Sequence, residues 1–153
     1  MSDIFGRVFS IFLAVIILFG MPFIYMNERA KSARQLFLLT ESTAFIDSTC
    51  NTGVITDETL RRFYEKISRG GPVNIKLLHE SKEYSPAGEV SVFYDEDDIY
   101  KAIDAGERYA FLKGDYLKVM VWVNESFSIF PQIKDNSVSV YYGGTIKQSY
   151  EDS

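Results

Sequence analysis

Residue types that carry most acid–base and metal chemistry are scarce in this chain. His79 is the only histidine and Cys50 the only cysteine among its 153 residues. A single histidine cannot form a two-histidine metal site, and a single cysteine cannot form an internal disulfide or a cysteine-based zinc site. We expect His79 to face solvent at the end of a strand. The sequence predicts no catalytic residue, no cofactor site and no metal site.

The run from Asp95 to Asp98 is the densest cluster of acids and raises the question of a calcium site. An EF-hand loop needs acids at alternate positions, then a glycine and a later glutamate, and this run lacks the glycine. Four acids at the start of a helix are explained by capping and by the helix dipole. Helix capping is the interpretation we adopt, with a cation site as the alternative.

Two glycine pairs and one sequon complete the candidate motifs. Gly70-Gly71 and Gly143-Gly144 are predicted to be turns, because neither precedes a helix with the Lys-Ser/Thr of a phosphate-binding loop. Asn124-Glu125-Ser126 is a glycosylation sequon, which matters only in a cell that glycosylates secreted proteins. None of these motifs predicts an enzyme.

The charge balance bears on possible partners. Lys and Arg number 16 against 21 Asp and Glu, which gives a formal net charge of −5. Nucleic-acid binding needs a concentrated basic face. The nearest approach to one is formed by Arg61, Arg62 and Lys66, which lie among acids on one predicted helix and are interpreted as a solvated face. Nucleic acid is therefore not an expected partner.

The segment from Val8 to Met26 predicts a membrane-spanning helix. It contains no charged residue, and as a helix it spans about 28 Å, close to the ~30 Å hydrocarbon core of a bilayer. A core helix of a soluble protein is rarely apolar on every side, and a cleaved signal peptide has a shorter apolar run before a small-residue cleavage site. We therefore expect residues 1–27 to form an N-terminal segment and transmembrane helix, with the lipid bilayer as partner.

Two arguments about the side of the membrane conflict. Arg7 precedes the apolar segment, whereas Arg29, Lys31 and Arg34 follow it, and the positive-inside rule assigns the larger group to the cytoplasm. A β-rich domain on a short N-terminal anchor more usually faces outward. We expect a single-pass protein of the cell membrane with an extracytoplasmic globular domain, although the Lys/Arg count argues the other way.

Residues 28–53 are predicted to continue the helix as an amphipathic stalk. No proline or glycine interrupts residues 27–50, and apolar or small residues recur three and four positions apart. The predicted stripe consists of Leu36, Leu39, Thr43, Ile46 and Cys50, and Phe37, Leu38 and Phe45 widen it. Asn51-Thr52-Gly53 is a typical helix end.

Residues 54–153 are predicted to form one small globular domain. Thr56 fits an N-cap with acids in the following turn, and a second helix is expected from Asp95 to Ala105. The apolar face of the first of these helices consists of Leu60, Phe63, Tyr64 and Ile67.

The rest of this domain favours strands. Alternation and β-propensity predict them at residues 73–78, 90–94, 116–123 and 137–142, with Lys113-Gly114-Asp115 as a turn. We therefore expect an α+β fold. A long N-terminal helix, half transmembrane and half amphipathic, packs on a small antiparallel β-sheet with one or two short helices.

Several segments, in their order along the chain, resemble a known family. They are the apolar start, residues 21–29 and 43–56, Lys113-Gly114-Asp115-Tyr116 and the terminal Val140-Tyr141-Tyr142-Gly143-Gly144. This order resembles small membrane-anchored, pilin-like proteins found with Tad-type pilus or secretion systems of Gram-positive bacteria, similar in layout to TadE-like pseudopilins. The resemblance implies a cell-surface component of a type IV filament-like machine. Its implied partners are other pilin-like or assembly-platform membrane proteins.

One departure from the pilin pattern matters. Type IV pilins are cleaved after a small residue and carry a glutamate at the fifth position of the mature helix. Cleavage after Gly6 would place Ile11 there, and the apolar segment contains no acid. This departure favours a minor or accessory subunit that stays in the membrane over a major pilin.

The expected function is therefore a structural or accessory component of such an assembly, without catalysis. The alternative is a membrane-tethered binding or sensing module that recognises a protein or a small ligand. An exposed apolar patch or a pocket on the globular domain would favour the alternative.

Overall fold

The computed structural model describes residues 2–86, 88–106, 108–123 and 138–150. They form two compact units, Met1–Arg34 and Gln35–Ser153, and helix α1 (Ser2–Thr52) contributes to both. The predicted α+β class with a long N-terminal helix is confirmed. The sequon at Asn124 lies outside the described residues.

The first unit is the N-terminal part of α1, and its described side chains form no core. The described side chains of residues 4–19 are all exposed, and no part of the span Ile4–Pro22 is buried. By length and composition this helix is able to cross a membrane, a property that a signal sequence near an N-terminus shares. The predicted apolar N-terminal helix is thus present.

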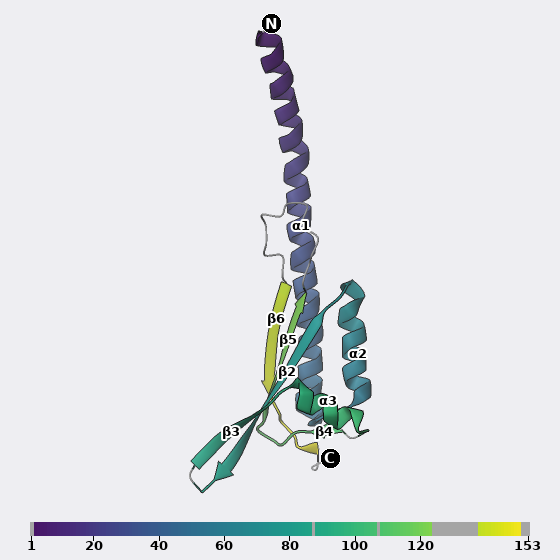
Figure 1. Cartoon of the computed structure of the whole chain (residues 1–153), viewed down its shortest axis with the longest axis vertical. Coiled ribbons are helices and arrows are strands. Elements are labelled where there is room, and N and C mark those ends of the chain that lie inside the picture. The colour runs from purple at the N-terminus through teal and green to yellow at the C-terminus, as the bar shows by residue number, and fades with distance from the viewer. Residues whose placement is uncertain (1, 87, 107, 124–137, 151–153) are drawn as a thin grey trace. The chain divides into compact units, whose positions relative to one another are not determined.

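A four-stranded antiparallel sheet forms the centre of the second unit (Figure 1). Its strands lie in the order β3-β2-β5-β6, with the bounds β2 Asn74–Ser85, β3 Gly88–Tyr94, β5 Tyr116–Val123 and β6 Val138–Thr145. A separate two-stranded pair consists of β1 (Val54–Ile55) and β4 (Tyr109–Ala110). This pair connects the chain directly after α1 to the segment that leads into β5, and the sequence did not predict it.

The C-terminal part of α1 lies between the sheet and helix α2 (Asp57–Ile67), as Figure 1 shows. On one side, Phe45 stacks on Phe63 of α2 with ring centroids 4.4 Å apart. On the other side, α1 comes so near β6 that a Cβ added to Gly144 would lie 2.9 Å from Sγ of Cys50. This double contact buries residues of α1 on two flanks and makes them part of one core.

The predicted stripe on α1 is wrong in its first half. Leu36 is 64% exposed and Leu39 is also exposed, whereas Leu38, predicted only to widen the stripe, and Ser42, outside it, are buried. Ile46 and Cys50 are buried as predicted. The sequence pattern marked apolar residues, but the face that is covered depends on where the sheet and α2 lie, and a helix surface with apolar residues on several faces does not specify this.

The short helices begin as predicted. Thr56 caps α2 through a capping box with Thr59. Asp95 caps α3 (Glu96–Asp104) by accepting a hydrogen bond from the backbone N–H of Asp97 at 3.1 Å. A short 3₁₀ turn, η1 (Ser68–Gly70), follows α2. Among the described residues, no group of three or more potential metal ligands gathers at the acidic run or elsewhere.

Two predictions about individual residues in this unit are wrong. Tyr64, assigned to the apolar face of α2, is exposed, while Leu60, Phe63 and Ile67 are buried. Gly143-Gly144 is not a turn, because β6 continues through both residues to Thr145. A Cβ at Gly143 would lie 2.8 Å from Cζ of Tyr116, so close packing, not chain reversal, requires glycine there. Gly71, by contrast, has φ +119 and lies in a turn as predicted.

Candidate functional site

His79 is buried, with only 4% of its surface exposed, and the prediction that it faces solvent is wrong. The alternation that buries Val73 and Leu77 continues along β2, so that His79 and Ser81 fall on the same inner face. β2 also extends well beyond the predicted end of the strand. His79 is therefore an interior residue of the sheet and not a strand-end residue.

Asp115, in the confirmed turn before β5, is the centre of a buried polar network. Its Oδ2 accepts hydrogen bonds from Nε2 of His79 at 2.9 Å and from the backbone N–H of Leu112 at 2.8 Å. Its Oδ1 accepts a hydrogen bond from Oγ of Ser81 at 2.8 Å. The backbone N–H of Ile146 donates to the backbone carbonyl of Asp115 at 2.8 Å. The buried carboxylate is thus surrounded by donors, which is the condition for burying a charge without a large penalty.

The imidazole of His79 is held on both of its nitrogens. Nδ1 lies 2.8 Å from the hydroxyl of Tyr109. Because a carboxylate only accepts, the proton is assigned to Nε2, and Nδ1 of the neutral ring then accepts from Tyr109. The ring stacks on Tyr94 at a centroid distance of 5.2 Å and meets Phe111 edge-on at 4.8 Å. Hydrogen bonds and aromatic rings together define one orientation of the imidazole.

Burial shifts the pKa values of His79 and Tyr109 in opposite directions. It lowers the pKa of His79 below the ordinary value of 6.5, and the hydrogen bond and negative charge of Asp115 oppose this shift only in part. Burial also raises the pKa of Tyr109 far above the ordinary value of 10, and the neighbouring Tyr94, Asp98 and Asp115 add to the rise. Near pH 7 the imidazole and the phenol are therefore both neutral.

Serine, histidine and aspartate in one network invite comparison with a Ser-His-Asp triad, and the geometry excludes that role. In a triad the serine hydroxyl donates to the histidine, which activates it as a nucleophile. Here Ser81 donates to Asp115, and the second nitrogen of His79 contacts Tyr109. Ser81 and Asp115 are also buried, out of reach of a substrate. The network fastens β2 to the chain between β4 and β5.

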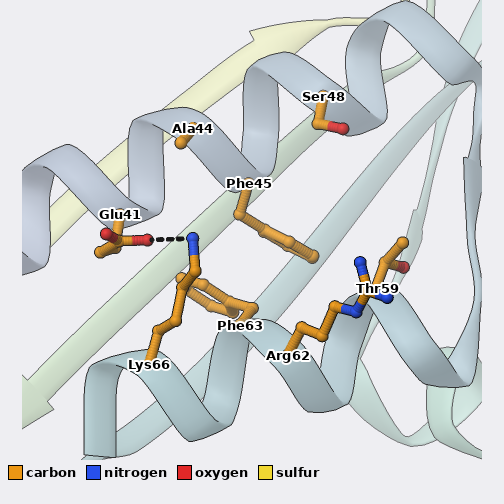
Figure 2. A pocket seen from close by; sticks show the side chains of 8 residues that line it. All are labelled: Glu41, Ala44, Phe45, Ser48, Thr59, Arg62, Phe63 and Lys66. Carbon is orange, nitrogen blue, oxygen red and sulfur yellow. Dashed lines mark hydrogen bonds and ion pairs between the residues drawn. The ribbon is translucent and has the colours of Figure 1, made fainter. Parts of the chain in front are cut away.

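A shallow groove of about 280 Å³ lies on the surface between α1 and α2 (Figure 2). Figure 2 shows the rings of Phe45 and Phe63 facing each other in it, and Lys66 reaching Glu41 across it. The residues that line it are Glu41, Ala44, Phe45, Ser48, Thr59, Arg62, Phe63 and Lys66.

The side chains that line this groove interact mainly with one another, as in an ordinary contact between two helices. Nζ of Lys66 lies 3.1 Å from Oε2 of Glu41, and Arg62 pairs with Glu58 on its own helix. The basic side chains that line the groove therefore both have a carboxylate partner. The stacked aromatic rings fill the space beneath, and the volume is below the range of typical small-molecule sites. The groove offers a ligand little that is not already used within the protein.

Comparison of the chain with protein-family models, with curated proteins and with solved structures finds no match in any of the three.

Sequence reasoning missed the network at His79 although a signal for it was present. Extending the alternation of Val73, Ile75 and Leu77 by two more steps reaches His79 and then Ser81. Two polar residues on the inner face of a strand require buried partners. The identity of those partners, Asp115 and Tyr109, depends on strand order and register and has no local signal.

Proposed function

We propose that this chain is a single-pass membrane-anchored, pilin-like structural or accessory component of a type IV filament or Tad-like pilus or secretion assembly. The observation that carries the proposal is the composition of α1. The same helix presents an unburied apolar span, Ile4–Pro22, and further along contributes residues to the core of the second unit (Gln35–Ser153), the α+β head. About 28 Å of exposed apolar helix is suited to a bilayer and is unfavourable in water.

The head adds support for a role without catalysis. The polar cluster that resembles catalytic machinery is buried, and its hydrogen bonds are used within the fold. Its serine donates to the carboxylate of Asp115 and not to the histidine, so this cluster lacks the serine–histidine contact of a catalytic triad. The family resemblance of residues 21–29 and 43–56 gives the assembly class, with other pilin-like or platform proteins as partners and the head on the extracytoplasmic side.

Fractionation with a matched pair of variants tests the anchor. The native chain is expected in the membrane pellet after alkaline carbonate extraction, at full length. Replacing Val15 and Ile16 together by Arg places two charges in the span and costs about 5–7 kcal/mol of insertion free energy, which should release the protein. Ala44→Arg adds a charge on the exposed surface of the same helix within the head and should leave the protein in the pellet. A soluble product shortened by the apolar span would show a signal sequence and contradict the anchor.

Shearing the surface of producing cells tests the assembly role. We expect the full-length chain in the membrane fraction, cross-linkable to proteins with similar apolar helices. Abundant protein in sheared filaments, shortened by a few N-terminal residues, would instead show a processed major pilin. Absence of any filament or platform protein among the cross-linked partners would contradict the assembly role.

A membrane-tethered binding module is the second candidate, and one observation favours it. Tyr141, on β6, is 60% exposed, and Tyr116 at the start of β5 is exposed as well. Exposed aromatic residues on a sheet are common at recognition surfaces. Loss of a specific bound protein or ligand on replacing both tyrosines by serine, with the head still folded, would favour this function over assembly.

A further inference from the structure

Two side chains lie together on the exposed surface of α1 just beyond its apolar span. Nη2 of Arg29 donates a hydrogen bond to the hydroxyl of Tyr25 at 3.1 Å, and the guanidinium carbon lies 4.8 Å from the centroid of the Tyr25 ring. Tyr25 is 60% exposed, and Arg29 is exposed as well. Residues four positions apart on a helix are neighbours, and a guanidinium over an aromatic face is a cation–π contact. We call these two residues the Tyr25–Arg29 pair.

The place of this pair along the helix is the level of the lipid headgroups when the span lies in a bilayer. Tyr25 is three residues beyond Pro22, where the apolar span ends, which is about 4.5 Å along the helix. The polar layer on each side of the hydrocarbon core is roughly 5–7 Å thick. Helical side chains tilt toward the N-terminus, and the guanidinium of Arg29 reaches back to Tyr25. In a bilayer its positive charge therefore lies at the depth of the lipid phosphates.

Arg29 differs from the arginines on helix α2 of the head. Arg61 and Arg62 each pair with a glutamate four positions away on their own helix. The position four residues before Arg29 holds a tyrosine instead, and a neutral phenol does not cancel the charge of the guanidinium. Tyr25 also uses only one of the five N–H donors of the side chain. The pair thus holds the guanidinium in place and leaves donors for an anion.

The ligand that suits these donors is the phosphodiester of a lipid. A guanidinium presents its N–H groups as a planar fork that matches two oxygens of a phosphate. Residues 23–34, which follow the span, contain three basic residues against one acid, Glu28, and basic residues next to a membrane span attract anionic lipids. A tyrosine ring favours the boundary between acyl chains and headgroups. An anionic phospholipid combines the phosphate, the negative charge and the location that these features require.

We propose that the Tyr25–Arg29 pair is a binding site for the phosphodiester of an anionic phospholipid. Arg29 donates hydrogen bonds to the phosphate oxygens, and Tyr25 positions the guanidinium through its ring and hydroxyl. The inference rests on the proposed membrane anchor and adds a specific lipid ligand to it.

Native mass spectrometry of the full-length chain in detergent tests the site with two lipids of identical acyl chains, phosphatidylglycerol and phosphatidylcholine. We expect the native chain to bind phosphatidylglycerol about tenfold more tightly. Arg29→Gln should reduce this preference to about twofold, because it removes both the charge and the fork. Arg69→Gln removes the same charge from an exposed position in the head and should keep the preference. No preference in the native chain, an unchanged preference in Arg29→Gln, or an equal loss in both variants overturns the proposal.

Tyr25→Leu tests the pair without changing any charge. Leucine removes the ring and the hydroxyl that hold the guanidinium, and should weaken phosphatidylglycerol binding about threefold. Tyr64→Leu, at an exposed tyrosine of α2, is the matched control and should have no effect. Binding as tight as that of the native chain in Tyr25→Leu would indicate a general charge effect and contradict the pair as a site.

Two further measurements separate the source of the phosphate and the anchor from the site. Millimolar inorganic phosphate should not displace phosphatidylglycerol, and displacement would indicate a site for free phosphate and overturn the assignment to a lipid. Arg29→Gln should stay in the membrane pellet after carbonate extraction, because the apolar span is unchanged. Release of the native chain by carbonate would contradict the anchor and the site with it. A retained native chain without lipid preference would contradict the headgroup site alone.

Discussion

The two parts of α1 are both rich in apolar residues, but only the second part buries apolar side chains in a core. Within Ile4–Pro22 no side chain is buried. Within residues 35–52, one flank meets β6 and another stacks on α2, and Leu38, Phe45 and Ile46 are buried. The difference shows that hydrophobicity alone does not place a residue in a core. A core also needs a protein surface to cover it, and the first part of α1 has none within its own unit.

Removing an aromatic ring from each part should give the largest contrast. Phe45→Ala deletes a ring that is buried and stacked on Phe63, and it should lower the free energy of unfolding of the head by about 3–5 kcal/mol. Phe19→Ala removes an exposed ring and should leave that free energy unchanged. Denaturant unfolding in detergent, followed by the fluorescence of the single tryptophan, Trp122, measures both. Equal destabilisation by the two variants would contradict the contrast.

Adding a methyl group within the first part of α1, or on β6 where it faces the second part, should give an intermediate effect. Gly144→Ala pushes a Cβ to 2.9 Å from Sγ of Cys50 and 3.1 Å from Cγ2 of Ile46, and should destabilise the head by about 1–3 kcal/mol. Gly20→Ala meets nothing within 4 Å and should be neutral for the head. The midpoint of thermal unfolding compares them. A Gly144→Ala variant as stable as the native chain would show that α1 and β6 are less tightly packed than described.

Changing the pH should give the smallest effect, and only in the head. Because burial lowers the pKa of His79, the folded state binds fewer protons than the unfolded state below pH 6.5. The contribution of His79 to stability is therefore fully present above about pH 6.5 and is lost as the pH falls through the lowered pKa, with a slope of at most about 1.4 kcal/mol per pH unit.

His79→Gln provides the control for this pH dependence. It should flatten the dependence between about pH 6.5 and 5, since carboxylates titrate mainly below that range. Membrane retention should not change over the same range, because the span Ile4–Pro22 contains no histidine or acid. An unchanged slope in His79→Gln would assign the effect to another group.

Much of the fold could be predicted from the sequence, because local rules determine it. The end of α1 at Thr52, the cap at Thr56 and the acids that begin α3 each depend on neighbouring residues only. The strands follow from alternation. The two-residue strands β1 and β4 carry no such pattern, and only the path of the chain after α1 brings them together.

The candidate site is harder to predict from the sequence, because it depends on contacts between residues that are distant along the chain. His79, Tyr109 and Asp115 come from three different parts of the chain. The alternation along β2 marks His79 as inward-facing, but no local pattern marks Tyr109 and Asp115 as its partners. The glycines at 143 and 144 were misread for a similar reason. A glycine in a turn and a glycine in a closely packed strand look the same in a sequence. Only the approach of Tyr116 to Gly143 and of α1 to Gly144 distinguishes them.

The packing of α1 on β6 has a consequence for the order of events during synthesis. Cys50 and Ile46 leave the ribosome long before Gly144, which is about ninety residues later and takes roughly 5–20 s to be made. Until then the buried flank of α1 has no sheet to cover it, while the apolar span ahead of it is already free to enter a bilayer. The head is therefore complete only when β6 has been made, and until then this flank of α1 stays exposed.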